Sequence, residues 1–181
     1  MTGDQTIASF VADLSARQPT PGGGASAAVT AAIACATAAM ACRYTTGEKW
    51  PAVTTEAEAL AAQLDAWRTD ALHFADADAT AYGAVGIAKK SKDPATIAAA
   101  ARAAAAVPAG LIALCGAAAH ACADFRPRCN PWLVSDIDTA LHLLAGAARA
   151  ARCTLLMNQP AAALINQATA TVAAISVAEP V

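Results

Sequence analysis

The segment from residue 25 to residue 42 contains no charged side chain, and it limits the possible folds of this chain more than any other feature. It is mostly alanine, with Val29, Ile33 and Met40 as its larger apolar residues. Alanine is the strongest helix former, and its small side chain lets neighbouring helices approach closely. The segment meets the length of a membrane span, but its few large apolar residues favour a helix buried inside a helical bundle.

The composition extends this interpretation to the whole chain. Hydrophobic residues make up 57% of the 181 residues and aromatic residues only 4%, and no stretch alternates apolar with polar side chains as a half-buried strand would. We therefore predict an all-α fold, a single domain over residues 1–181 with about six helices. A net charge of −2 with 14% charged residues argues against nucleic-acid binding. The start of the chain lacks a signal-like segment, so we expect a cytoplasmic protein that does not bind membranes.

Capping and helix-breaking residues predict where the helices begin and end. Asp4 and Asp93 are expected N-caps, Thr55 and Glu58 an expected capping box, and Pro108 should kink the helix that contains it. Glycines and lysines in the segment 83–92 are expected to interrupt the chain between two helices. The expected helices span residues 5–15, 25–43, 55–82, 94–123 and 135–157, with a last helix ending near residue 177.

One aspartate lies on the apolar face of the third expected helix. Apolar residues recur there with alternating spacings of four and three, and Asp78 continues the series. At about 100° per residue, Asp78 lies within roughly 40° of the apolar stripe, whereas Asp76 is expected to be solvated. A carboxylate among apolar groups is costly unless it is paired, hydrogen-bonded or protonated. Asp78 is therefore either a catalytic group or a structural carboxylate that pairs with an arginine or caps another helix.

Two further segments are candidates for ligand contact. Gly22, Gly23 and Gly24 precede a helix, where the backbone can approach a ligand and helix N–H groups are unpaired; the alternative is a turn that needs small residues for packing. Asn130, Ser135 and Asp136 lie at another expected helix start, where they either line a cleft or cap that helix. Several cations at helix ends or in loops are ordinary surface charges or hold an anionic ligand tail: Arg43, Lys49, Lys89, Lys90, Lys92, Arg126 and Arg128.

The cysteines and histidines do not predict a metal site. The six cysteines form no CxxC pair, so we expect them to be reduced and mostly buried in helices. His73, His120 and His142 fall on different expected helices, and no histidine–cysteine spacing matches a metal site. We therefore expect a site without a metal.

Several of these segments, in this order, resemble one family. The run from Pro19 to Gly24 looks like its signature turn, and Asp76 to Tyr82 resembles its acidic helix segment. Asn130-Pro131 through Ser135-Asp136 resembles its Asn-Pro-x-x-x-Ser-Asp segment, and Asn158 its late asparagine. The family is that of methenyltetrahydrofolate cyclohydrolases, also found as the C-terminal domain of formiminotransferase-cyclodeaminase.

The resemblance implies a helical homodimer that binds a folate. It implies hydrolysis of 5,10-methenyltetrahydrofolate to 10-formyltetrahydrofolate, with the tetrahydrofolate derivative as substrate and no cofactor. Asp78 matches the family's helix carboxylate and is the expected catalytic residue. The expected substrate-binding residues are Gly22, Gly23, Gly24, Lys49, Asn130, Ser135 and Asp136.

Two other functions remain open. The first is formiminotetrahydrofolate cyclodeaminase activity, because both reactions use the same cation and the same acid–base chemistry. The second is a divergent helical dimer that binds a ligand or partner without catalysis. Departures from the family pattern favour the second: Glu48 replaces a basic residue, Thr154 stands where asparagine is common, and the charged C-terminal helix is missing.

Overall fold

The alanine-rich segments form long helices, as the composition predicts. The computed structural model describes residues 1–178, and in that part of the chain it has six α-helices, three 3₁₀ turns and no strand. The helices are α1 (Ile7–Ser15), α2 (Gly23–Arg43), α3 (Thr54–Ser91), α4 (Pro94–Phe125), α5 (Val134–Met157) and α6 (Ala162–Ala178). The 3₁₀ turns are η1 (Thr2–Asp4), η2 (Arg126–Arg128) and η3 (Pro131–Leu133).

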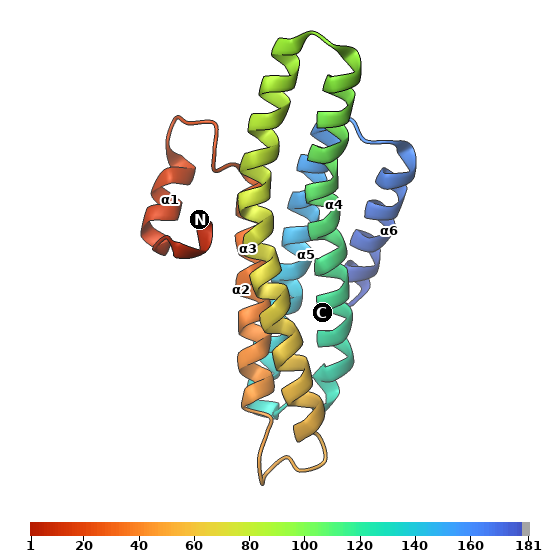
Figure 1. The fold of residues 1–181 in the computed structure, drawn as a ribbon. Coiled ribbons are helices and arrows are strands. Elements are labelled where there is room, and N and C mark those ends of the chain that lie inside the picture. The colour runs from red at the N-terminus through yellow and green to blue at the C-terminus, as the bar shows by residue number, and fades with distance from the viewer. Residues whose placement is uncertain (179–181) are drawn as a thin grey trace.

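Helices α2, α3, α4 and α5 form a bundle in which each helix packs against two neighbours (Figure 1). Helix α6 covers α4 and α5, and α1 stands beside the bundle next to α2 and α3 (Figure 1). One cluster of buried residues includes members from all six helices. At one end, α3 and α4 extend together beyond the start of α2 and the end of α5 (Figure 1).

Helix α2 supplies a large part of the buried core. Nine of its ten alanines and both of its cysteines, Cys35 and Cys42, are buried, and it packs against α3 and α5. The prediction of a buried helix for this segment is therefore confirmed. By length and composition alone, α2 and the segment Pro94–Arg128 would each be long and apolar enough to cross a membrane, but most of α2 is covered by the rest of the bundle.

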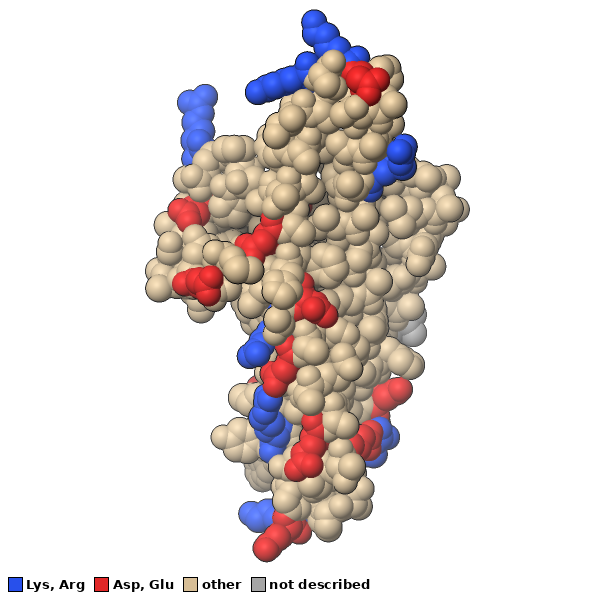
Figure 2. Space-filling view, in the orientation of Figure 1, with Lys and Arg blue, Asp and Glu red and all other residues tan. Residues whose placement is uncertain are grey.

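Charged residues are sparse on the bundle surface. Figure 2 shows them mainly in a column along α3 and at the two ends of the molecule, with uncharged surface between. Lysines gather at the end where α3 meets α4, which carries Lys89, Lys90 and Lys92 (Figure 2). On this face of the molecule (Figure 2), the surface between these groups is largely uncharged.

The glycine and proline signals misplaced two helix boundaries. Helix α2 begins at Gly23, so Gly23 and Gly24 form its first turn rather than a preceding loop. Helix α3 continues through the segment 83–91, where a break was expected, and ends at Lys92 in the left-handed conformation (φ 59°). Each interior glycine costs a helix up to about 1 kcal/mol, and the alanines around it, with Ala88 buried, outweigh that cost.

Two of the expected caps also need revision. The first helix is capped by Thr6, whose hydroxyl accepts from the N–H of Ser9, and not by Asp4, which lies in η1. Helix α3 has no capping box, because it begins at Thr54, whose hydroxyl donates to the carbonyl of Trp50. Asp93 is confirmed as the N-cap of α4, and this helix runs through Pro108 without interruption.

Asp76 is not the solvated residue that the sequence predicted. Its carboxylate accepts hydrogen bonds from the backbone N–H (2.8 Å) and the hydroxyl (2.7 Å) of Thr2. Although partial burial acts to raise it, these two hydrogen bonds lower the pKa of Asp76 below its ordinary value. Asp76 therefore ties the N-terminal turn to α3, while Asp78 faces a different part of the molecule.

Candidate functional site

Asp78 is half-buried on α3, where its carboxyl group lies against the first turn of α2. Gly24 packs directly against it: a Cβ atom added there would lie 2.6 Å from Oδ2 of Asp78 and closer still to Oδ1 and Cγ. Such contacts are not possible between real atoms, so only glycine at position 24 leaves room for this carboxyl group. Gly24 therefore acts through packing, as one of the two interpretations of the glycine run proposed.

The first turn of α2 also supplies an electrostatic environment for Asp78. The N-cap of α2 is Gly22, which has no side chain to bond the free N–H groups of the first turn. The backbone N–H of Ala25 interacts with the Asp78 carboxylate. The positive end of the helix dipole lies at the same place and favours a negative charge. Asp78 thus takes the position of a cap for another helix, which the sequence left open as its structural role.

Burial has the larger effect on the ionisation of Asp78. Loss of water around the carboxyl group raises the pKa of Asp78 above the ordinary aspartate value, and the Ala25 N–H lowers it only in part. No arginine, lysine or histidine in residues 1–178 forms a salt bridge with Asp78. Asp78 is therefore a carboxyl group without a cationic partner in the described part of the chain, and its pKa lies above that of a solvated aspartate.

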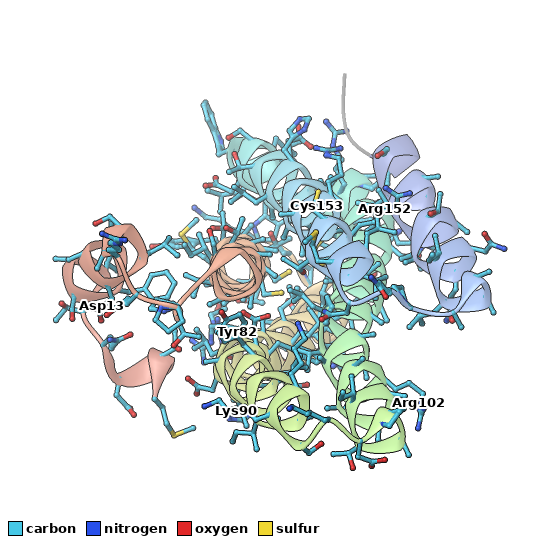
Figure 3. All side chains as sticks on the ribbon, turned by 90° about the horizontal axis from the view of Figure 1, so that it is seen from above. Asp13, Tyr82, Lys90, Arg102, Arg152 and Cys153 are labelled. Atoms are coloured by element: carbon cyan, nitrogen blue, oxygen red, sulfur yellow. The ribbon has the colours of Figure 1, made fainter. Side chains whose placement is uncertain are left out.

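Asp78 forms part of the wall of a cavity of about 400 Å³, a volume within the range of small-molecule sites (roughly 300–1,000 Å³). The cavity lies where the start of α2 and the end of α5 meet the C-terminal part of α3. Tyr82, Val85 and Lys89 line it from α3, and Figure 3 shows Tyr82 on the side of α3 nearer to α2. The remaining walls come from Pro19, Thr20, Gly22, Gly23, Gly24, Ala81, Ala104, Thr154, Met157 and Asn158.

The structure brings some of the sequence-predicted site residues together and separates others. Gly22, Gly23, Gly24 and Asp78 share the cavity. Lys49, Asn130, Ser135 and Asp136 do not line it, because they lie near the C-terminal end of α2 and the start of α5 (Figure 1). The length of α2 separates the two groups within one subunit by about 30 Å.

Asn130 has structural contacts at that distant end. Its side-chain oxygen accepts from the N–H of Trp132 (3.1 Å), and its side-chain nitrogen donates to the carbonyl of Tyr44 (3.3 Å). Its backbone N–H donates to the hydroxyl of buried Thr45 (3.1 Å). Asn130 therefore caps η3 and joins the end of α2 to the chain before α5.

Several polar residues of the cavity wall were not predicted as substrate-binding residues from the sequence, which gave Lys89 only as one of several cations that could hold an anionic tail. Tyr82 and Lys89 follow Asp78 by four and eleven positions, so the helical periodicity that singled out Asp78 would also have found them. Thr154 and Asn158 lie four positions apart on α5, and Asn158 donates to the carbonyl of Thr154 (3.2 Å). Their approach to Asp78 depends on the packing of α5, which the sequence does not show.

Three of the seven basic residues that could have held an anionic ligand are paired within the protein. Arg43 pairs with Asp65, Arg126 with Asp138, and Arg128 with Glu56. Lys89 is the only Lys or Arg in residues 1–178 that lines the Asp78 cavity. Any ionic contact made by this subunit to a ligand in the cavity therefore falls to Asp78 and Lys89.

The cysteine thiols do not line the Asp78 cavity. All six cysteines are free, and five of them are buried. Burial raises the pKa of Cys35, Cys42 and Cys115 to about 12, so these groups stay protonated and unreactive at neutral pH. Within residues 1–178, no three histidine, cysteine or carboxylate side chains are arranged to hold a metal ion.

Comparison with known proteins gives consistent matches. The family model for formiminotransferase-cyclodeaminase matches residues 6–175. A methenyltetrahydrofolate cyclohydrolase of Methylorubrum extorquens is 43% identical over 49 residues, a match that spans 27% of this chain and only 24% of that protein's length. The crystal structure of formiminotetrahydrofolate cyclodeaminase from Thermotoga maritima superposes with a TM-score of 0.93 at 24% identity, covering 99% of this chain and 94% of the other. The all-helical fold is thus shared with that structure.

The close packing of Gly24 on Asp78 predicts opposite effects for two glycine-to-alanine changes. Gly24→Ala must displace the carboxyl group and should lower the free energy of unfolding by about 1 kcal/mol or more. Gly86→Ala, in α3 where a Cβ meets no atom within 4 Å, should raise it by up to about 1 kcal/mol, since alanine is the better helix former. Urea unfolding of both variants checks this, and equal stabilisation by both changes would contradict the packing.

Proposed function

Because the chain belongs to the formiminotransferase-cyclodeaminase family, we propose that it hydrolyses 5,10-methenyltetrahydrofolate to 10-formyltetrahydrofolate, with Asp78 as its catalytic residue. The observation that carries this proposal is the half-buried carboxyl group of Asp78 in the wall of a cavity of suitable size. The short match to a protein named methenyltetrahydrofolate cyclohydrolase supports the choice of reaction.

The substrate suits an unpaired carboxylate. 5,10-Methenyltetrahydrofolate carries a positive charge delocalised over N5, N10 and the carbon between them. A carboxylate shielded from water attracts such a cation more strongly than a solvated one does. Asp78 has no cationic partner in residues 1–178, so its charge is available to the ligand.

The same group supplies the proton transfers of hydrolysis. Asp78 accepts a proton from the water that attacks the methenyl carbon, which gives a neutral tetrahedral adduct. The proton then goes to N5 as the bond between that carbon and N5 breaks, and the formyl group stays on N10. One further proton leaves to solvent, because the substrate is a cation and the product is not. The raised pKa of Asp78 suits a group that both takes up and returns a proton near neutral pH.

Formiminotetrahydrofolate cyclodeaminase activity is the second candidate. In that reaction N10 attacks the formimino carbon of 5-formiminotetrahydrofolate, and ammonia leaves after it is protonated. The reaction passes through a tetrahedral carbon bonded to the same two nitrogens, so Asp78 would serve as the acid in the same position. The third candidate is a dimer that binds folate without turnover, which the departures at Glu48 and Thr154 favour; Thr154 lines the cavity.

We also propose that the chain forms a homodimer. Large apolar side chains lie exposed at the outer face of α2 and beside its end: Ile33 is 50% exposed, Tyr44 66% and Trp132 90%. Neighbouring exposed apolar groups of this size favour contact with another protein surface, and the uncharged α2 face suits a second copy of itself. The buried free cysteines agree with the proposed cytoplasmic location, where thiols remain reduced.

Asp78→Asn tests the catalytic role. Turnover of 5,10-methenyltetrahydrofolate, followed by the loss of its near-UV absorbance, should fall by about two to four orders of magnitude. The control is Asp70→Asn, the same change at an exposed site on α3, which should leave turnover unchanged. Release of ammonia from 5-formiminotetrahydrofolate would indicate the cyclodeaminase instead. A rise in melting temperature with folates but without turnover would indicate the non-catalytic dimer.

The same variant should be more stable than the wild type at neutral pH. Because the pKa of Asp78 is higher in the folded than in the unfolded chain, ionisation of the wild-type residue costs stability as the pH rises through that interval. Asparagine carries no charge at any pH and avoids this cost. The melting temperature of Asp78→Asn should therefore exceed that of the wild type by a larger margin at about pH 8 than at about pH 4. A margin that shrinks as the pH rises would contradict the raised pKa.

Ile33→Glu tests the proposed dimer. A charge at the centre of the outer face of α2 should shift the protein from dimer to monomer in size-exclusion chromatography with light scattering. Ile87→Glu places the same charge on α3, where the isoleucine is 73% exposed, and should leave the dimer intact. A monomeric wild type, or dissociation by both changes, would rule out this face as the interface.

A further inference from the structure

Lys89 and Asp78 are opposite charges at two positions in the wall of one cavity. They are eleven residues apart on α3, which is about 16 Å along the helix axis and places them within roughly 20° of the same face. Tyr82 and Val85 lie between them on that face. No carboxylate in residues 1–178 forms a salt bridge with Lys89. The cavity wall therefore presents an anion, an apolar surface and a cation in a line.

The direction of helical side chains brings the two charges closer than their Cα atoms are. Long side chains on a helix lean toward its N-terminus, so the ammonium of Lys89 leans back toward Asp78. The carboxyl and ammonium groups are then on the order of 10–15 Å apart. A ligand that bridges them needs a cationic centre and an anionic group at that separation, joined by a flat or apolar part that fits against Tyr82 and Val85.

A monoglutamyl folate has this arrangement of charges. From its methenyl carbon to the carboxylates of its glutamate, standard bond lengths across the benzoyl ring and the amide give about 10 Å or slightly more. We propose that Lys89 binds a glutamate carboxylate of the substrate while Asp78 faces the methenyl carbon. This assignment rests on the proposed function, and it makes Lys89 a residue that positions the substrate rather than one that takes part in bond breaking.

Other cations of the subunit are less suitable for this role. Lys49 lies in the loop at the far end of α2, about 30 Å from Asp78 in the same subunit. Lys90 follows Lys89 directly but is turned about 100° around α3, does not line the cavity, and lies on the outer side of the helix in Figure 3. A substitution of Lys90 is thus a matched control, because it removes the same charge from a position outside the cavity.

Arg102 belongs to a second cavity. That cavity, of about 740 Å³, lies between α4 and the chain joining α5 to α6, and Arg102 is on the outer side of α4 (Figure 3). Asn158 borders both cavities, and its side-chain nitrogen donates to the carbonyl of Ala104 (3.5 Å) between them. A folate tail that crossed this contact would reach Arg102 instead of Lys89, and the experiment below separates the two routes.

The experiment compares two substrates in the full-length protein. One is 5,10-methenyltetrahydrofolate and the other is 5,10-methenyltetrahydropteroate, which lacks the glutamate. Lys89→Met should raise the KM for the folate about twofold to fivefold with little change in kcat, because an exposed ion pair contributes to binding and not to the chemical step. The KM for the pteroate should not change. Lys89→Arg should retain most of the wild-type KM, and Lys90→Met should match the wild type on both substrates.

The possible outcomes are distinct. A wild type that turns over neither substrate overturns the proposed function, and this assignment with it. An active wild type in which Lys89→Met leaves the folate KM unchanged, or raises both KM values equally, overturns the assignment of Lys89 alone. A glutamate-dependent loss in Arg102→Gln or Lys49→Met without one in Lys89→Met also overturns it, and places the tail in the second cavity or across a subunit interface.

Discussion

The contact between the carboxyl group of Asp78 and the first turn of α2 is the interaction on which the rest of the site depends. It requires a glycine at position 24, because any side chain there would overlap the carboxyl atoms. It also requires α2 and α3 to approach closely, which the alanines of α2 allow along its whole length. The small residues of α2 thus serve both the packing of the bundle and the placing of a carboxylate at the start of a helix.

The same contact balances two opposite effects on the charge of Asp78. The Ala25 N–H and the helix dipole favour the carboxylate, while burial favours the neutral acid and has the larger effect on its pKa. Selection for stability alone would favour an uncharged residue at position 78, because the Ala25 N–H and the helix dipole offset only part of the cost of burying the charge. A family member that acts on a cationic folate has a chemical reason to retain the charge, because the ligand supplies the opposite charge that the protein does not.

The sequence predicted the class of fold and the inward position of Asp78 because both follow from local periodicity. The sequence placed Gly23, Gly24 and the segment 83–91 outside helices, because glycine taken by itself indicates a turn or loop. In the structure they are helical, because the packing of α2 on α3 and the alanines of α3 determine where these helices end. Asp76 was misjudged because its partner Thr2 is distant in sequence. Lys89 was seen as one of several basic residues, because a loop was expected where α3 carries it onto the face of Asp78. The sequence also does not show how far Asp78 lies from Asn130, Ser135 and Asp136. That distance depends on how the helices pack, and within one subunit the packing places the two groups at opposite ends of α2.

The most direct test of the role of Asp78 is the titration of its carboxyl carbon by carbon-13 NMR, assigned by the signal that Asp78→Asn removes. This carbon should titrate clearly above the ordinary aspartate pKa of about 3.9, as burial without a cationic partner requires. A titration of Asp78 at or below that value would show that the helix start stabilises the carboxylate fully, and it would contradict the role of Asp78 as a proton-transfer group.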